Sequence, residues 1–285
     1  MFKYFSQFFF IVLVGCGGAD MNTNKPNLEF EIGSPIMHSI SASTGIYNKD
    51  CFLDICVYKF SLAFSEPLRA NLSIKAKSGE LKFDDIVSAS LGTYGSDIIG
   101  DANVTLGGVD PGSKHSEALH YFYQQIDKLH AEGWKRYIFQ NEARLTGSQL
   151  KNFKEHNTIL NQPVVTGPWV DPGLRLKVAE WLELPMFSSW YFYKDGVYLL
   201  FRVQREDSEK APHENGSYLF TLTFESEAEF YKSFVKNEYR DDWIKLLPAE
   251  LKRMAQERAQ TEARLKKMGI AIDEDYQDPP IKALE

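Results

Sequence analysis

The sequence predicts an α+β protein in which antiparallel sheets are each covered on one face by helices. Aromatic residues make up 14% of the 285 residues, with 20 Phe and 14 Tyr, and many lie in strand-like segments. Some segments alternate apolar and polar residues with a period of two, whereas 114–132 repeats its apolar residues at helical spacing. We expect two related lobes, 37–155 and 156–247, followed by a charged helix over 248–269.

The start of the chain has the features of a secretory signal peptide. Lys3 precedes an apolar run over 8–14, which is much shorter than the roughly 20 residues that cross a bilayer. The run ends in Leu13-Val14-Gly15-Cys16, which resembles the lipobox of bacterial lipoproteins. The resemblance implies that residues 1–15 are removed and that Cys16 carries the acyl chains of a membrane anchor. The alternative is an ordinary signal peptide with an accidental cysteine.

Residues 16–36 are predicted to form a flexible tether, because small and polar residues dominate the stretch 17–27. In enteric lipoproteins an Asp after the lipidated cysteine retains the protein in the inner membrane. The Gly17 found here implies the outer membrane, with the body facing the periplasm. Loss of Lys3 leaves 31 basic against 39 acidic residues, a net charge of −8. Such an acidic body is poorly suited to nucleic acid, so the lipid must supply the membrane affinity.

The two cysteines after Cys16 are Cys51 and Cys56, and we predict that they form a disulfide. An even pair of cysteines in an oxidising compartment is usually bridged. Five residues of straight strand span about 16 Å, whereas a disulfide needs Cα atoms less than about 7 Å apart. Residues 52–55 must therefore turn, which predicts a local hairpin or bulge. Two reduced, buried cysteines are the alternative.

Local patterns place the other elements of the first lobe. The helix is the clearest, because its apolar residues recur at steps of three and four and Gly133 follows as a stop. A helix that leads directly into a strand must pack back onto the sheet. The predicted elements are strands at 55–64 and 72–76, a helix at 114–132 and a strand at 134–139.

The second lobe has a clearer antiparallel pattern. A Lys194-Asp195-Gly196 turn between 190–193 and 197–203 predicts a hairpin, and 218–224 predicts a third strand. Ser226-Glu227-Ala228-Glu229 then forms a capping box that opens a helix to about residue 235.

Two features near the end of the chain are candidates for contact with a protein partner. The helix at 248–269 is strongly charged and has a thin apolar seam, so we expect it on the outside, with a solvated acidic tail at 270–285. Its partner-facing residues would be Arg253, Arg258 and Arg264, unless the helix is a plain solvated cap. In the loop 166–173, Trp169 stands between two Pro-Gly elements, either as an exposed anchor or folded onto the body.

Catalytic signatures are missing from the sequence. There is neither a Gly-x-Ser-x-Gly elbow nor a glycine-rich phosphate loop. His115 and His120 are five residues apart on the predicted helix, about 140° apart around its axis, so they do not form a metal pair. We therefore expect a binding protein without a metal or other cofactor, and not an enzyme.

A resemblance to a known family comes from two short stretches. Gly133-Trp134-Lys135-Arg136-Tyr137-Ile138 and the aromatic segment 190–198, in an acidic lipoprotein of this length, resemble lipoproteins found beside type VI secretion effectors. The resemblance implies an immunity protein that blocks a phospholipase effector in the periplasm. It identifies no functional residue. The alternative is an envelope assembly or structural lipoprotein that binds another envelope component.

Overall fold

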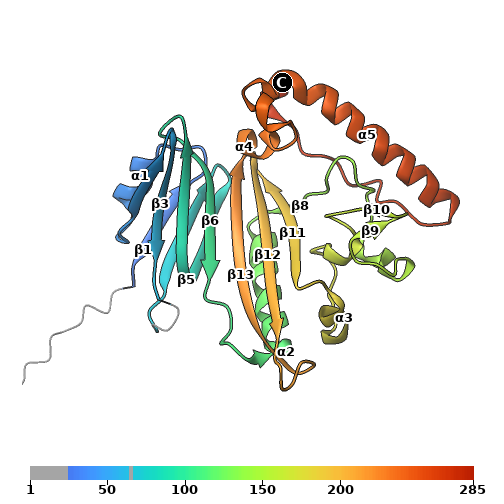
Figure 1. Cartoon of the computed structure of the whole chain (residues 1–285), viewed down its shortest axis with the longest axis horizontal. Helices are drawn as coiled ribbons and strands as arrows, with labels where there is room; N and C mark the ends of the chain where they lie inside the picture. The colour runs from blue at the N-terminus through green and yellow to red at the C-terminus, as the bar shows by residue number, and fades with distance from the viewer. Residues whose placement is uncertain (1–24, 64–66) are drawn as a thin grey trace, which may run out of the picture.

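The structure is a computed structural model that describes residues 25–63 and 67–285. The predicted signal peptide, 1–15, and Cys16 lie outside these residues. The α+β class is confirmed: in the described part of the chain, one large, mostly antiparallel sheet of 11 strands is accompanied by few helices and a long C-terminal helix (Figure 1). The strands of the sheet are β1 (Asn27–Glu31), β2 (Asn48–Phe52), β3 (Ile55–Ser61), β4 (Ala70–Ala76), β5 (Gly79–Tyr94), β6 (Ile99–Leu106), β7 (Ser113–Lys114), β8 (Lys135–Arg136), β11 (Phe187–Lys194), β12 (Val197–Asp207) and β13 (Asn215–Ser226).

The other elements surround this sheet. Two short strands, β9 (Thr158–Ile159) and β10 (Gln162–Pro163), form a separate ribbon. The helices are α1 (Ile36–Ala42), α2 (His115–Ala131), α3 (Val178–Glu183), α4 (Glu227–Lys232) and α5 (Trp243–Lys267). Short 3₁₀ turns lie at Gly147–Asn152, Pro168–Val170, Asn237–Asp242 and Lys282–Leu284.

The sheet joins strands from both ends of the chain. Its order is β1-β4-β5-β6-β13-β12-β11-β8, and β3, with β2 beside it, pairs with the second half of β5. The β1–β4 pair is parallel, whereas the other pairs of this sheet are antiparallel. β6 pairs with β13 from Asp101↔Glu225 to Thr105↔Thr221, so the predicted lobes 37–155 and 156–247 contribute strands to one continuous sheet.

The predicted hairpin and third strand of the second half are confirmed as β11, β12 and β13. Asp195 and Gly196 at the β11–β12 turn have φ values of 54° and 87°. Two positive φ values are what a tight hairpin turn with the natural strand twist requires, and Asp-Gly adopts them readily. Along β13, residues alternate between buried and half-buried, which turns one face of the strand to the core.

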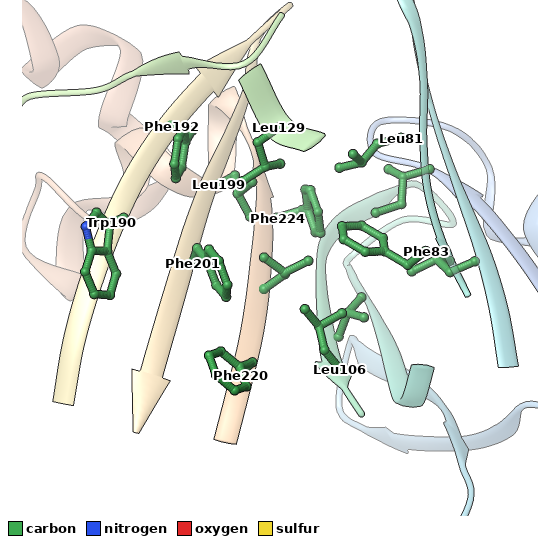
Figure 2. Close-up of a cluster of buried hydrophobic side chains, with 14 of the residues drawn as sticks. Leu81, Phe83, Leu106, Leu129, Trp190, Phe192, Leu199, Phe201, Phe220 and Phe224 are labelled. Atoms are coloured by element: carbon green, nitrogen blue, oxygen red, sulfur yellow. The ribbon is translucent and has the colours of Figure 1, made fainter. Parts of the chain in front are cut away.

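The core lies on the concave face of the sheet, where the N-terminal and C-terminal strands face each other. Figure 2 shows Leu81 and Phe83 of β5 pointing toward Phe224 of β13. Phe30 of β1 also meets Phe224, with ring centroids 6.0 Å apart. This core therefore forms between residues that are far apart in the sequence.

Helix α2 fills this concave face, and it confirms the predicted helix at 114–132. Phe122 packs against Trp190 and Phe201, with ring centroids 4.3 Å and 5.3 Å away. The helix ends where Gly133 adopts a φ of 82°. The strand predicted at 134–139 is shorter than expected, since only Lys135–Arg136 pairs as β8.

Ordered structure begins earlier than the predicted tether 16–36 allows. β1 lies within that range and pairs in parallel with β4. Its residues Leu28 and Phe30 are buried in the core. The polar stretch before them hid the alternation of Leu28, Phe30 and Ile32, which is the local sign of a half-buried strand.

The C-terminal helix also begins earlier than predicted, at Trp243 rather than near Pro248, which lies inside the helix. Trp243 and Leu247 are buried in an aromatic cluster with Tyr198 and Phe230. Proline favours the first turn of a helix, which predicted a start near Pro248. Burial of Trp243 and Leu247 instead extends the helix upstream of Pro248.

The tail 270–285 is largely exposed, as expected, but several of its residues contact the body. Ile270 is buried, and the Tyr276 hydroxyl accepts a hydrogen bond from the backbone N–H of Ile138 at 2.8 Å. Asp278 forms an ion pair with Arg258 at 2.7 Å. These contacts fix the tail to the body. The Tyr276 hydroxyl meets a residue 138 positions earlier in the chain, and the Asp278 carboxylate meets a residue of α5 that is 20 positions earlier.

Candidate functional site

The two predicted disulfide cysteines close a tight hairpin at the end of β2 and β3. Cys51 and Cys56 lie directly opposite each other, with Cα atoms 4.1 Å apart, and form a disulfide. Phe52 pairs with Ile55, which leaves Leu53 and Asp54 as the turn. The predicted bridge and the predicted local hairpin are thus both present in the structure.

An apolar row crosses three strands at this hairpin. Phe52 on β2 is opposite Ile55 on β3, and Ile55 is opposite Tyr94 on β5. Residues that are directly opposite in neighbouring strands share one face of a sheet. Phe52, Ile55 and Tyr94 therefore form a continuous row on the same face.

This row lies on the outer face of the sheet. The neighbouring cross-strand positions, Cys51, Cys56 and Thr93, point the other way, and Thr93 is buried. Further along β3, the outward positions Lys59 and Ser61 are polar and exposed. A large apolar row on a solvated face is therefore an exception to the pattern of the same strands.

The side chains of this row and turn are well exposed. Phe52 and Leu53 are 77% and 85% exposed, and Ile55 and Tyr94 are 41% and 38% exposed. We call these four residues the hairpin tip. Single exposed apolar residues are common, but four large ones gathered at one hairpin and the strand beside it mark an interaction surface.

The backbone of the hairpin tip is strained and firmly held. Leu53 has a φ of 55°, a left-handed conformation that costs an L-residue about 1–2 kcal/mol. The disulfide lies on one side of the turn, and the Gly95 N–H donates to the Asp54 carbonyl at 2.9 Å on the other. The large side chain of Leu53 is thus held in a position where glycine would be easier, which favours a functional reason for it.

An acidic strip borders the hairpin tip on the same face. Asp101 on β6 is opposite Gly92 on β5 and opposite Glu225 on β13. A Cβ at position 92 would lie 1.9 Å from Asp101 Oδ1, so glycine leaves the room that this carboxylate occupies. We call Asp101, Glu225 and Glu229 the acidic strip.

The charges of the acidic strip interact with one another. Burial raises the pKa of Glu225, and the nearby carboxylates of Asp101 and Glu229 raise it further. Burial also raises the pKa of Asp101, against the hydrogen bond from Tyr94. The Tyr94 hydroxyl donates to Asp101 Oδ1 at 2.8 Å, and burial together with Asp101 raises the pKa of Tyr94. This hydrogen bond connects the hairpin tip to the acidic strip.

Of the two alternatives for Trp169, the structure has the one in which the residue is folded onto the body. It is only 6% exposed, and its ring packs against His156 with centroids 4.0 Å apart and the ring planes tilted by 59°. The buried Glu142 carboxylate accepts hydrogen bonds from the backbone N–H groups of Val165 and Thr166, at 2.5 Å and 2.6 Å. These hydrogen bonds to Glu142 hold the loop that contains Trp169 against the body.

The three arginines predicted to face a partner have different environments. Arg258 is buried and donates to the Glu142 and Phe139 carbonyls at 2.9 Å and 2.8 Å, so its assignment as a partner-facing residue is wrong. Arg253 is exposed but pairs with Glu250 and Glu257 on its own helix. Arg264 is exposed as predicted and makes no ion pair with the described residues.

The sequence predicted the cysteines of the hairpin but missed the apolar residues between them. A sequence signal for the tip does exist, since Leu53 occupies a turn position where glycine or asparagine is usual. The contribution of Tyr94 had no such signal. It depends on the pairing of β3 with β5, which joins residues far apart in the chain.

Other kinds of site were sought in the described residues. No group of three or more His, Cys, Asp or Glu side chains there is arranged to hold a metal ion. His115 is buried, with Nδ1 2.6 Å from the Tyr218 hydroxyl and Nε2 3.0 Å from the Pro212 carbonyl. No helix within residues 25–63 and 67–285 is long and apolar enough to span a bilayer.

In comparisons with protein-family models, curated proteins and solved structures, no significant match to this chain was found.

Proposed function

We propose that this chain is a lipid-anchored binding protein of the bacterial envelope that faces the periplasm, and that it acts as an immunity protein against a lipase-type effector. The observation that carries the proposal is the hairpin tip, a group of four exposed apolar side chains closed by a disulfide. A lipase holds the acyl chain of its substrate in an apolar cleft. Phe52 and Leu53 offer apolar surface of the same chemical kind on a narrow, projecting hairpin.

Preorganisation of the hairpin tip supports tight binding. A flexible loop loses conformational freedom when it binds, whereas a hairpin closed by Cys51 and Cys56 has already lost most of it. Aromatic and large apolar anchors at the centre of an interface typically carry most of the binding energy. We therefore assign Phe52 and Leu53 as the central anchors.

The acidic strip supports an electrostatic contribution at the rim of the same interface. Asp101 and Glu225 lie on the face that carries the apolar row. Carboxylates at a rim speed the approach of a partner that carries basic residues around its cleft, and they contribute less to the final affinity than buried anchors do. The expected partner surface is thus an apolar cleft with a basic rim.

The lipid anchor gives this activity its location. Cys16, if acylated as the lipobox resemblance implies, holds the body at the membrane that a lipase effector attacks. Replacement of Cys16 by Ser should remove the label that radioactive palmitate gives to the wild-type protein. Equal labelling of the two proteins would contradict the anchor.

The test of the function uses cells that express a lipase-type effector, encoded beside this gene and directed to the periplasm. Cells should survive when they also express the wild-type chain and should die when they express the Phe52→Asp, Leu53→Asp variant. Loss of a central anchor costs about 2 kcal/mol or more, which is about thirtyfold in affinity. The control is Met268→Asp, a single change to Asp at an apolar residue that is 61% exposed after the end of α5.

Survival that does not depend on the presence of this chain would overturn the immunity function. The envelope-binding alternative would then be favoured, in which the hairpin tip binds a component of the envelope. Survival that requires the chain but is unchanged by the hairpin variant would reject the hairpin tip as the site.

A further inference from the structure

One edge of the large sheet is open next to a cavity. β8 covers β11 only at its C-terminal end, where Arg136 pairs with Phe192 and the Tyr137 N–H donates to the Tyr191 carbonyl at 2.9 Å. In a strand, successive residues direct their backbone groups to opposite sides. Phe187 and Ser189 therefore direct theirs the same way as Tyr191, away from β12.

The even-numbered residues of this segment direct their backbone groups the other way, toward β12. The Met186 carbonyl accepts from the Arg205 N–H of β12 at 2.8 Å, so the even-numbered residues serve the β11–β12 ladder. On the opposite side, within the described residues, the backbone groups of Phe187 and Ser189 have no hydrogen-bond partner. The open edge therefore consists of the outward N–H and C=O groups of Phe187 and Ser189.

At the β1 edge of the sheet the chain covers outward backbone groups with its own residues, whereas β2, among the described strands, pairs only with β3. The Asn27 carbonyl of β1 accepts from the Thr44 N–H at 2.8 Å, and the Asn27 N–H donates to Thr44 Oγ1 at 2.9 Å. The Glu29 N–H similarly donates to Ser43 Oγ at 2.9 Å. Proteins usually cover or blunt their sheet edges to avoid unwanted pairing, so an edge left open is a candidate for intended pairing.

A cavity of about 190 Å³ lies directly beside the open edge. Its lining includes Ser189 on one side and Val164 and Trp169 on the other. Ligand pockets for whole small molecules are larger, about 300–1,000 Å³, so this volume suits a single side chain. The lining also includes the apolar residues Val165 and Phe187, which are 47% and 60% exposed.

The walls of the cavity combine apolar surface with unpartnered polar atoms. The ring of His156 packs against Trp169, and His156 Nε2 and Trp169 Nε1 are buried without a hydrogen-bond partner among the described residues. The far wall, formed by Val164 and Val165, stands opposite the strand edge.

We propose that the edge of β11 at Phe187 and Ser189 binds a short extended segment of a partner protein as an added β-strand, with one small side chain of that segment in the cavity. The free backbone groups specify an extended peptide, because they match its own N–H and C=O groups. The volume of the cavity, about 190 Å³, limits its occupant to a single small side chain. This site is separate from the hairpin tip and does not depend on the function proposed for it.

The test measures amide hydrogen exchange by NMR with a probe peptide, the capped pentapeptide Thr-Val-Thr-Val-Thr. In the wild-type protein, saturating peptide should slow exchange at Phe187 and Ser189 by about tenfold or more, because their N–H groups gain partners. Ser188 and Trp190 already bond to β12 and should change little.

Two variants and a control make the test specific. Ser189→Pro removes the outward N–H without removing a bond to β12, so it should abolish the peptide effect while circular dichroism shows an intact sheet. Ser189→Ala keeps the N–H and should behave as the wild type. Val165→Asp puts a charge in the lining of the cavity and should weaken peptide binding at least tenfold without any change in β11.

Three results would overturn the proposal. The first is the absence of protection at Phe187 and Ser189 at millimolar peptide in the wild-type protein. The second is equal protection in the Ser189→Pro variant. The third is protection that rises with protein concentration and without peptide, which would identify a second copy of the chain as the occupant. The Phe52→Asp, Leu53→Asp variant should keep the peptide effect, so failure of the hairpin tip is distinguishable from failure of this site.

Discussion

Asp101 and Glu225 face each other directly across β6 and β13, the two strands through which the N-terminal and C-terminal parts of the sheet are joined. Like charges at directly opposite positions destabilise a strand pair. The side-chain hydrogen bonds that Tyr94 and Asn103 donate to Asp101 reduce this cost. The junction is therefore sensitive to the protonation of its carboxylates.

Glu225→Gln should make the protein more stable at pH 7.5. Burial, Asp101 and Glu229 raise the pKa of Glu225 above its ordinary value of 4.5, so the folded state holds this proton more tightly than the unfolded state. Its favourable contribution is present below pH 4.5 and is lost as the pH rises through the folded-state pKa. Urea denaturation should show a gain of a few tenths of a kcal/mol at pH 7.5, the scale of a cross-strand pair, which shrinks toward pH 4.5.

The control for this change is Glu206→Gln. Glu206 is exposed on β12 and faces Ser217 across the strand pair, so it has no carboxylate opposite it. The difference in stability between the Glu206→Gln variant and the wild type should be the same at pH 7.5 and at pH 4.5. A stabilisation of Glu225→Gln that is equal at both pH values would contradict the protonation mechanism.

Arg258→Met should destabilise the protein by about 3 kcal/mol, whereas Arg253→Met should cost less than about 1 kcal/mol. Arg258 is buried, and its loss leaves the Glu142 and Phe139 carbonyls without the donor that they meet in the fold. Arg253 is exposed and pairs only with residues of its own helix. Thermal and urea denaturation of both variants measure the difference. Equal costs would show that the buried network contributes nothing beyond a surface ion pair.

Leu53→Gly should leave the stability unchanged or raise it by up to about 1 kcal/mol, because glycine adopts a positive φ without strain but loses more entropy on folding. The same change should weaken partner binding at least tenfold, since it removes the most exposed apolar side chain of the hairpin tip. Asp54→Gly is the control in the same turn, and it should cost stability without a loss of binding. A large stability loss in Leu53→Gly would reject the idea of stored strain.

Replacement of Cys51 and Cys56 by Ala should cost about 2 kcal/mol, the chain-entropy value for closing so short a loop. The sheet should survive, because Tyr58 and Phe60 of β3 remain buried. Denaturation with and without a reductant checks the source of the effect. The reductant should shift the midpoint of the wild type by the same amount and leave the double variant unaffected. A shift in the double variant would point to an effect of the reductant elsewhere.

The sequence by itself determined those elements whose cause is local. The Asp195-Gly196 turn predicts a hairpin because few other residue pairs adopt its backbone angles, and α2 follows from an apolar stripe that needs no knowledge of its neighbours. The turn between Cys51 and Cys56 follows from the reach of the chain. Such features depend on residues within a few positions of one another.

Only the tertiary structure decided which side chains are exposed and which strands are neighbours. Trp169 is buried because Glu142 holds its loop, and Arg258 is buried because it meets carbonyl groups of a segment more than a hundred residues earlier. The row of Phe52, Ile55 and Tyr94 exists because β3 pairs with β5. Strand pairing and burial arise between distant segments, and the local periods of 3.6 and 2 residues carry no information about which segments meet.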